Sequence, residues 1–542
     1  MELLGGHGIE PSAKLKRLAT CVVQQGKVRK SVLLALKPPP RNPQQHEVRV
    51  PCKVLRSTRS LSFTTIKVYM VNEVVEILYR EYPSRFRQMF LGETGLYEFW
   101  SKVKLDDPRL VGHPMVSKPR WMHRAIPIVI HGDGFVFTKN NNSMGAVSFG
   151  GVMGSGWSEI ACWLMALFPK SCRTYGSVLG VENDTWQVIW KWLRHGLDAL
   201  FSGVHPESDP DGMDWPANSD AARLAGTSIC DGHFFATLWL LANDREWVSN
   251  ELRWPHWNAL AWCGYCNSRR GDTDFSLNAP WKACLRHGVG AGYNHPVWGA
   301  PGVSRYMFLG DWAHGVDGGT FLYLHFECLN FIKTHLCRGL ADASAAAYMW
   351  SLIKAGYDAC GVPQDRRLQS LLLKHFKRKP GKSFVAMKMS KSKALVKALH
   401  HVLGEYCLDS EIGLHLYQCY SYSIDMLVII DKPGLFLESD RDAEALLYSV
   451  DHWLLHYKAL HCMTGGVQFN ITNKFHTFWH IAYLARYQHP RAGWTYVWED
   501  FMGKLQRMCS ALTDGTPHHR VALKAMENYE LCVAESLRRS SD

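Results

Sequence analysis

A short β-branched run that ends in a glycine-flanked acid constrains the fold of this chain more than any other part of the sequence. Residues 126–130 read IPIVI, and they lead directly into residues 131–134, which read HGDG. Such a run is typical of a buried strand, whereas Gly-Asp-Gly suits a hairpin turn. Residues 135–137 and 144–153 also read as extended. We therefore expect a strand–turn–strand–turn–strand meander in an α/β core.

The rest of the chain is mainly helical in pattern. Apolar residues at helical spacing predict helices at residues 63–104, 157–168, 186–201, 309–460, 475–486 and 498–512. One more apolar run, residues 234–242, reads as a core strand that ends at Asn243-Asp244. The fold class that we expect is therefore α/β or α+β, predominantly helical overall.

Changes in composition divide the chain into segments. Residues 1–60 form a basic leader with the run Pro38-Pro39-Pro40, which we expect to be disordered or extended. It is a candidate import signal or DNA-contacting arm, with a solvated tail as the alternative. A helical N-terminal segment, the first part of the core with a Cys-x-x-Cys loop, a helical insertion and the C-terminal helices follow, at residues 61–120, 121–308, 309–465 and 466–542.

The charge balance and the cysteine usage restrict the class of protein. Lys plus Arg is 61 and Asp plus Glu is 49, and the resulting net charge of +12 favours an anionic partner such as nucleic acid. The 16 Cys are scattered along 542 residues, unlike a disulfide framework. No signal peptide is recognisable after Met1, and no run approaches the ~18 apolar residues that span a bilayer. We expect a nuclear or cytoplasmic protein with reduced thiols and no membrane partner.

Three acids stand where they can reach a common site. Asp133 follows a buried strand between glycines that let a metal ion or phosphate approach, with a turn as the alternative. Asp244 ends the apolar run, although it also fits a helix N-cap. Glu499 opens an amphipathic helix, where an acid also favours the helix dipole. Together the three carboxylates suit two-metal phosphoryl transfer with Mg²⁺ or Mn²⁺.

Cysteine and histidine pairs suggest a further metal site. Cys263-x-x-Cys266 is half of a structural zinc site. Its candidate completions are single residues elsewhere in the chain: Cys230, His256, Cys284 and His287. His476-x-x-x-His480 places two imidazoles on one helix face, but it lacks the Glu of a zinc protease, so we reject that class of enzyme.

Two further motifs carry polar groups. Asp311 and His314, in the sequence DWAH, supply a further ligand or a DNA contact, with a buried structural pair as the alternative. Residues 388–392 match the KMSKS signature of class I aminoacyl-tRNA synthetases, but the HIGH partner of that signature is missing. A basic strip that touches phosphates is the better interpretation. The expected nucleic-acid contacts are Lys388, Lys391, Lys393 and Arg491.

Taken in order, these blocks resemble the DDE transposases of the Plavaka and Kyakuja–Dileera–Zisupton type. Residues 126–134 are similar to the strand that carries the first catalytic Asp of that family. Residues 240–244, followed by the Cys263-x-x-Cys266 loop, are similar to its second acidic block. The remaining similar blocks are residues 301–303, 311–314, 473–476, 480, 489–491 and 499–501. The resemblance covers about residues 65–535, and the order of the blocks carries it.

The resemblance implies an RNase H-like core interrupted by a large helical insertion, with Asp133, Asp244 and Glu499 as catalytic metal ligands. It implies transposon-end DNA as the partner and leaves a homo-oligomer open. Glu246 is the alternative second acid, and Asp500 is a secondary candidate beside the third. The chain departs from the family after Asp133, where Gly-Phe-Val-Phe replaces a Thr-containing turn. We therefore expect either an Mg²⁺-dependent transposase or an inactive, domesticated derivative that binds nucleic acid.

Overall fold

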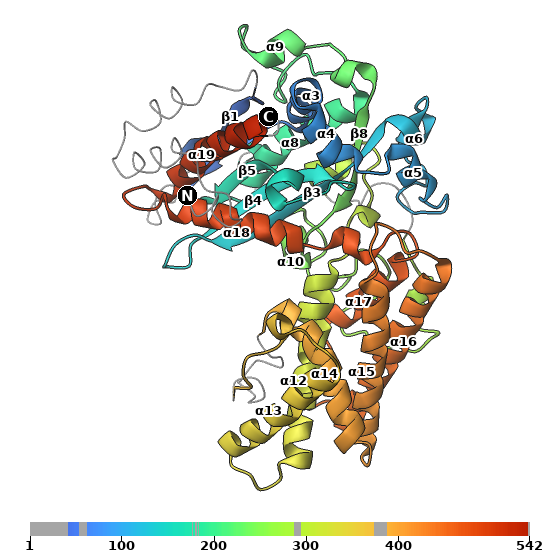
Figure 1. Cartoon of the computed structure of the whole chain (residues 1–542). Helices are drawn as coiled ribbons and strands as arrows, with labels where there is room; N and C mark the ends of the chain where they lie inside the picture. Colours follow the sequence, from blue (N-terminus) through green and yellow to red (C-terminus); the bar gives the residue numbers. More distant parts are fainter. Residues whose placement is uncertain are drawn as a thin grey trace.

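The computed structural model describes residues 42–53, 62–175, 177–178, 181–182, 184–286, 294–372 and 387–539. It has a mixed α/β architecture in which helices dominate. Figure 1 shows two lobes, one built around a sheet and the other built from long helices. The predicted class, α+β and predominantly helical, is confirmed at this level.

A four-stranded mixed sheet forms the centre of the first lobe. Its order is β5-β4-β3-β8, in which β4 pairs antiparallel with both β5 and β3, and β8 pairs parallel with β3. The four strands are β3 (Ala125–Val136), β4 (Ser143–Gly151), β5 (Trp163–Pro169) and β8 (Phe235–Leu241). Every residue of β5 and β8 is buried, so the sheet is covered on both faces.

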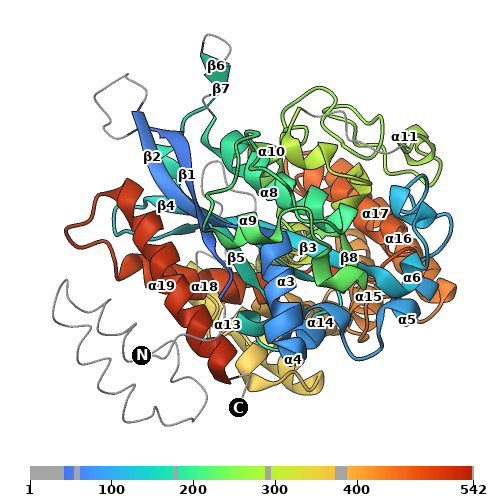
Figure 2. The same ribbon diagram turned by 90° about the horizontal axis from the view of Figure 1, so that it is seen from above.

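Helices from the first half and from the C-terminal part of the chain cover the two faces of the sheet. The helix α8 (Thr185–Ser202) packs on β8, whereas α18 (Tyr496–Ser510) and α19 (His518–Arg539) pack on β3 and β5. In Figure 2, α18 and α19 lie on one side of the strands and α8 lies on the other. The C-terminal helices therefore complete the core that the first half of the chain begins.

The N-terminal part of the lobe differs from the prediction. A hairpin of β1 (Gln45–Cys52) and β2 (Ser62–Tyr69) precedes α3 (Val71–Glu81), so residues 45–52 do not belong to a disordered leader and residues 62–69 are not helical. Val48 and Val50 are buried while Glu47 and Arg49 are exposed, which is the period of a half-buried strand, and the strand becomes fully buried from Val50 to Cys52. The rest of the predicted leader, residues 1–41 and 54–60, lies outside the described residues.

Two strands were predicted differently. The expected turn at residues 131–134 is wrong, because β3 continues as one strand through Asp133 to Val136 and pairs with β4 along that length. The expected helix at residues 157–168 is also wrong: a single turn, α7 (Ser158–Ala161), is followed by β5. A run that is apolar at every position fits a buried strand as well as a buried helix, so periodicity cannot separate the two.

The second lobe is a bundle of long helices inserted between β8 and α18. These helices are α12 (Phe321–Leu336), α13 (Asp342–Ala359), α14 (Met389–Tyr406), α15 (Glu411–Ile430), α16 (Asp440–Met463) and α17 (Asn473–Leu484). A π-helical segment, η7 (Ala313–Thr320), leads into α12 and contacts α14 and α17. The described residues of the region predicted to be helical, 309–372 and 387–465, are mainly helical, and α17 follows them.

Short elements connect these parts. They are α4 (Pro83–Phe86), η1 (Arg87–Leu91), α5 (Leu96–Ser101), α6 (Trp121–Arg124), β6 (Ser177–Val178), β7 (Val181–Glu182), α9 (Asp220–Leu224), α10 (Arg245–Glu251), α11 (Pro280–Ala283) and η10 (Pro490–Gly493). Among the described residues, no helix is long and apolar enough to cross a membrane.

A buried histidine holds three helices of the second lobe together. His325 of α12 is fully buried; its Nε2 donates to the carbonyl oxygen of Ser392 at 3.0 Å, and its Nδ1 accepts from the hydroxyl of Tyr420 at 2.8 Å. Burial lowers the pKa of His325 to about 3. The imidazole is therefore neutral in the folded protein throughout the physiological range.

This burial predicts a pH-dependent stability. Below about pH 6.5 the unfolded chain binds a proton at His325 that the folded protein does not bind until about pH 3, so stability falls as the pH falls between these values. His325→Gln removes this loss, which is worth up to about 1.4 kcal/mol per pH unit. We expect the variant to lose less stability than the parent between pH 7.5 and 5, measured by thermal unfolding. Equal losses, or the same relief from the exposed control His123→Gln, would contradict the assignment.

Candidate functional site

The pairing of β3 with β8 brings Asp133 and Asp244 to the same edge of the sheet. The amide of Ala242 donates to the carbonyl of Ile130 at 3.0 Å, just beyond the last residue of β8. The side-chain amide of Asn243 then donates to the carbonyl of Gly132 at 2.8 Å. Asp133 and Asp244 each follow one of the two residues that this second hydrogen bond joins, so the two acids are held next to each other.

Asp133 lies on the face of the sheet that α18 covers. Side chains alternate along a strand, and His131, two residues earlier, stacks on Trp498 of α18 with ring centroids 5.1 Å apart. The Oδ1 atom of Asp133 accepts from the backbone amide of Gly134 at 2.6 Å. Burial, and then the charge of Asp244, raise the pKa of Asp133 to about 6.

The two glycines beside Asp133 make room for protein side chains. A Cβ atom at Gly132 would lie 1.9 Å from Cζ2 of Trp247, and one at Gly134 would lie 2.4 Å from Nζ of Lys170. We predicted that these glycines leave space for a metal ion or phosphate. The structure shows instead that Trp247 and Lys170 occupy that space, so any ligand must approach Asp133 from the α18 side.

Asp244 has a structural contact as well as its place beside Asp133. It is the N-cap of α10, and its Oδ1 accepts from the amide of Trp247 at 2.6 Å, as the alternative interpretation predicted. Burial raises the pKa of Asp244, and the hydrogen bond from Trp247 opposes that rise. Glu246, the alternative second acid, is exposed in the first turn of α10.

Glu499 reaches the same region from α18. Its Oε1 lies 3.3 Å from Nε2 of His314 and accepts from the hydroxyl of Thr495 at 3.4 Å. Burial raises the pKa of Glu499, the charge of His314 opposes that rise, and the charges of Asp311 and Asp244 add to it. Glu499 is therefore close enough for the charges of Asp311 and Asp244 to affect its pKa.

His314 and Asp311 complete the cluster. Asp311 is buried and accepts from Nδ1 of His314 at 2.5 Å and from the hydroxyl of Thr495 at 2.9 Å. Burial lowers the pKa of His314, but Asp311, Glu499 and Asp244 outweigh burial and raise it to about 9. We call Asp133, Asp244, Asp311, His314 and Glu499 the acid centre.

Asp500 does not join the acid centre. Its carboxylate accepts from the hydroxyl of Ser158 at 2.6 Å and pairs with Lys504 at 2.9 Å, so it is engaged with α7. Consecutive residues of a helix point in directions about 100° apart, which separates Asp500 from Glu499.

The predicted nucleic-acid contacts are mostly engaged within the protein. Lys393 pairs with Asp431 and lies over the ring of Trp494, and Arg491 lies over the same ring, 4.8 Å from its centroid. Lys391 donates to the carbonyl of Asp365. Lys388 is exposed at the start of α14. Lys393 and Arg491 thus have a structural role, in joining α14 to the segment before α18.

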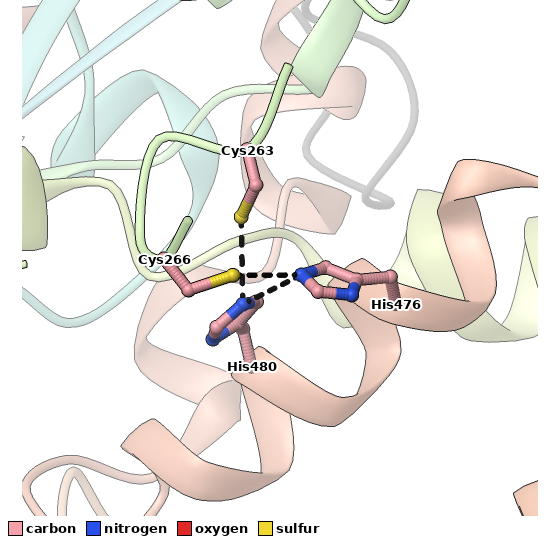
Figure 3. Close-up of side chains that lie close together, drawn as sticks. All are labelled: Cys263, Cys266, His476 and His480. Carbon is pink, nitrogen blue, oxygen red and sulfur yellow. Dashed lines mark hydrogen bonds between the residues drawn. The ribbon is translucent and has the colours of Figure 1, made fainter. Parts of the chain in front are cut away.

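Cys263, Cys266, His476 and His480 form a buried Cys₂His₂ group, shown in Figure 3. One ligand atom from each residue lies within 4.8 Å of all the others. Cys263 Sγ lies 3.4 Å from His480 Nε2, and Cys266 Sγ lies 3.2 Å from His476 Nε2. A tetrahedral zinc ion separates nitrogen and sulfur ligands by roughly 3.3–3.8 Å. The group can therefore bind a metal ion such as Zn²⁺ with small adjustments.

The protonation of this group also suits a metal ion. Burial raises the pKa of the Cys263 thiol, but hydrogen bonds with Cys266, His476 and His480 outweigh burial and hold that pKa well below its usual range. Burial lowers the pKa of His476 to about 4. The hydrogen bond with Cys263, and then burial, raise the pKa of the Cys266 thiol, so Cys266 keeps its proton until a metal ion displaces it. A thiolate and a neutral imidazole are the forms that bind zinc, and Cys263 and His476 already have them.

The sequence contains both halves of this group, but the residues that we expected to complete the site of Cys263 and Cys266 are different ones. Cys230 is buried elsewhere, with its amide donating to Glu76, while Cys284 is exposed and His256 contacts Asn258. His287 lies outside the described residues. The signal that was available is that Cys-x-x-Cys and His-x-x-x-His each supply two ligands on one short element.

The Cys₂His₂ group links the second acidic block to the helix that precedes α18. The neighbour of Asp244, Arg245, donates to the carbonyl of Trp262 at 2.7 Å and to the hydroxyl of Thr477 at 3.3 Å. Trp262 precedes Cys263, and Thr477 follows His476. Arg245, the residue after Asp244, therefore contacts the neighbours in sequence of two residues of the Cys₂His₂ group, Cys263 and His476.

Comparison with known proteins adds no family. The chain matches no protein-family model, and no curated protein shows significant similarity to it.

The Cys₂His₂ group predicts bound zinc. We expect the purified protein to contain about one zinc ion per chain, measured by elemental analysis after dialysis. Cys266→Ser should remove most of the zinc and lower the temperature of unfolding, because the metal joins the loop of Cys263 to α17. The control is Cys462→Ser, which changes an exposed cysteine of α16 and should keep the metal. Equal zinc content in both variants would refute the site.

Proposed function

We propose that this protein is a transposase-like enzyme that cleaves and joins DNA with Mg²⁺ or Mn²⁺, on an RNase H-like core. One observation carries the proposal: Asp133 from β3, Asp244 from the end of β8 and Glu499 from α18 converge at one edge of the sheet. These residues lie up to 366 positions apart, and their convergence requires the fold. If the three acids acted only in a turn, as an N-cap and as the partner of a helix dipole, the fold would not need to bring them together.

The topology of the first lobe supports the proposal. Three antiparallel strands, β3 to β5, are followed by the crossover helix α8 and by β8, which returns parallel to β3. This arrangement agrees with the mixed sheet that the transposase resemblance implies. The long helical insertion between the second and third acids agrees with it as well.

The residues of the acid centre fit a divalent cation. Asp133 and Asp244 are half-buried neighbours, and the charge of Asp244 contributes to the raised pKa of Asp133. A doubly charged ion between them would offset this repulsion, and carboxylate oxygens are the ligands that Mg²⁺ prefers. When bound, a pair of such ions would activate the attacking hydroxyl and stabilise the leaving oxygen.

The other groups of the centre have distinct tasks in this mechanism. Asp311 orients His314 through Nδ1, so that Nε2 faces Glu499. The charged imidazole would hold the Glu499 carboxylate in place until DNA and metal bind. Asp133 and Asp244 would hold metal with the carboxylate oxygens that their backbone hydrogen bonds leave free.

One contact favours a second candidate function. His314 already neutralises Glu499 at 3.3 Å, and an ion pair of this kind can stabilise the fold without metal. In this alternative the chain is a domesticated, catalytically inactive derivative that binds nucleic acid through its positive charge. It would bind DNA with a strong salt dependence and would not cleave it.

The proposal predicts a defined pattern of loss. Asp133→Asn should reduce Mg²⁺-dependent cleavage of supercoiled plasmid by about 10³-fold or more, because the substitution removes a metal ligand without changing side-chain size. Asp244→Asn should reduce cleavage to a similar extent for the same reason. Asparagine keeps the N-cap of α10, so this loss would not come from a disrupted helix. Glu246→Gln tests the alternative second acid and should retain activity.

The matched control is Asp500→Asn, which changes the neighbour of Glu499 but lies outside the acid centre. It should cleave at the parental rate, whereas Glu499→Gln should not. Cleavage by Asp133→Asn at the parental rate would exclude the acid centre as the site of reaction.

A further inference from the structure

An exposed tryptophan lies on the surface next to the acid centre. All 21 Trp fall in the described part of the chain, and Trp157 and Trp257 are the two whose side chains are exposed, with 56% of Trp257 accessible. Trp257 is in the loop between α10 and Cys263, with its ring 5.1 Å from that of His256. An exposed indole offers a flat face on which a nucleic-acid base can stack.

A short chain of contacts connects Trp257 to the acid centre. The side-chain amide of Asn473 donates to the carbonyl of Trp257 at 2.7 Å. The next residue, Lys474, is exposed and its Nζ donates to the carbonyl of His314 at 3.4 Å. The charge of Lys474 interacts with those of Asp244 and Asp311. The backbone of Trp257 is therefore linked through Asn473 to the next residue, Lys474, whose ammonium group lies at the rim of the acid centre.

Basic side chains also lie near the residue that follows Trp257. Arg269 and Arg270 are both exposed, and Arg270 donates to the carbonyl of Asn258, the residue after Trp257, at 3.4 Å. Arg270 therefore contacts the residue after Trp257, and Lys474 follows the residue that contacts Trp257 itself. Alternation of an exposed aromatic ring with cations matches a nucleic-acid strand, in which a base stacks on the ring and phosphates meet the cations.

We propose that Trp257, Asn473, Lys474 and Arg270 form a strip that binds the DNA strand next to the cleaved bond, with an unpaired base stacked on Trp257. This inference rests on the proposed function and adds the path of the substrate to it. Lys474 would hold the phosphate nearest the acid centre, and Arg270 would hold one beyond the stacked base. The indole face accepts any base, so the strip contributes affinity and position rather than sequence recognition.

The test is DNA binding under conditions that prevent cleavage. Binding of fluorescently labelled DNA is measured by anisotropy with Ca²⁺ in place of Mg²⁺, over a range of salt concentrations, using a duplex with a single-stranded overhang and a blunt duplex. We expect Trp257→Ala to weaken binding of the overhang by about 5- to 100-fold, and Trp257→Phe to restore most of it. Lys474→Met should reduce the slope of log affinity against log salt by about 1, while Lys474→Arg should keep it.

The helix α5 offers a matched control. Tyr97 is 55% exposed and its ring lies 4.8 Å from that of His123, much as the ring of Trp257 lies 5.1 Å from that of His256. Lys102 nearby pairs with Glu98. Trp100 of α5 bonds to Ala125, at the opposite end of β3 from Asp133 and about 26 Å away at 3.3 Å per residue. Tyr97→Ala combined with Lys102→Met should bind both DNAs as the parent does.

The outcomes separate this inference from the proposed function. Loss of DNA binding in the Trp257 and Lys474 variants of a protein that never cleaves DNA would reject the enzyme and keep the strip. Parental affinity and salt slope in both variants would overturn the strip even if Mg²⁺-dependent cleavage persists. Self-association of the parent that Trp257→Ala abolishes, with DNA binding unchanged, would assign the surface to a second copy of the chain and also overturn the inference. Parental zinc content and unfolding temperature of the variants exclude misfolding.

Discussion

The parallel pairing of β8 with β3 is the interaction on which the rest of the structure depends. Between the end of β3 and the start of β8 the chain forms β4, β5 and α8, so this contact closes a loop of about one hundred residues. The hydrogen bond from Asn243 to Gly132 extends the pairing beyond the last residue of β8. Because both faces of these strands are packed, a shift of register would mismatch the β8 side chains with the elements on either face, so the position of Asp244 beside Asp133 is fixed by the core itself.

The acid centre concentrates negative charge where burial makes it expensive. Asp133, Asp244 and Glu499 all have raised pKa values for this reason, and their interaction adds to the effect. His314 provides the positive charge within the centre. Its Nδ1 atom contacts Asp311 and Thr495, and its Nε2 atom faces Glu499. Further positive charge, from Lys474 or from a divalent ion, would stabilise an arrangement in which carboxylates outnumber the cation.

The Cys₂His₂ group solves a different problem, which is to fix a long loop. The segment from Trp254 to Ala279 contains no helix or strand of its own, yet its central part is buried. Ligands from Cys263 and Cys266 attach this segment to one face of α17. Through Arg245 and Thr477 the same attachment reaches the residue after Asp244, so direct contacts connect α17 to the acidic edge of the sheet.

The sequence alone determined the helix-dominated mixed class, the strands at residues 126–130 and 234–242, the helix at 186–201, the long helical insertion and the three acids that proved to be neighbours. These are local signals: apolar period, β-branched runs and acids at the ends of buried elements. It did not separate β5 from a helix, because a run that is apolar at every position has no period. It did not show that β3 continues through Asp133, since the glycines there serve Trp247 and Lys170 and not a turn. Only the tertiary structure joined Cys263 and Cys266 to His476 and His480 and placed Trp257 beside Lys474, because contacts across more than two hundred residues are set by packing, which leaves no trace in local sequence.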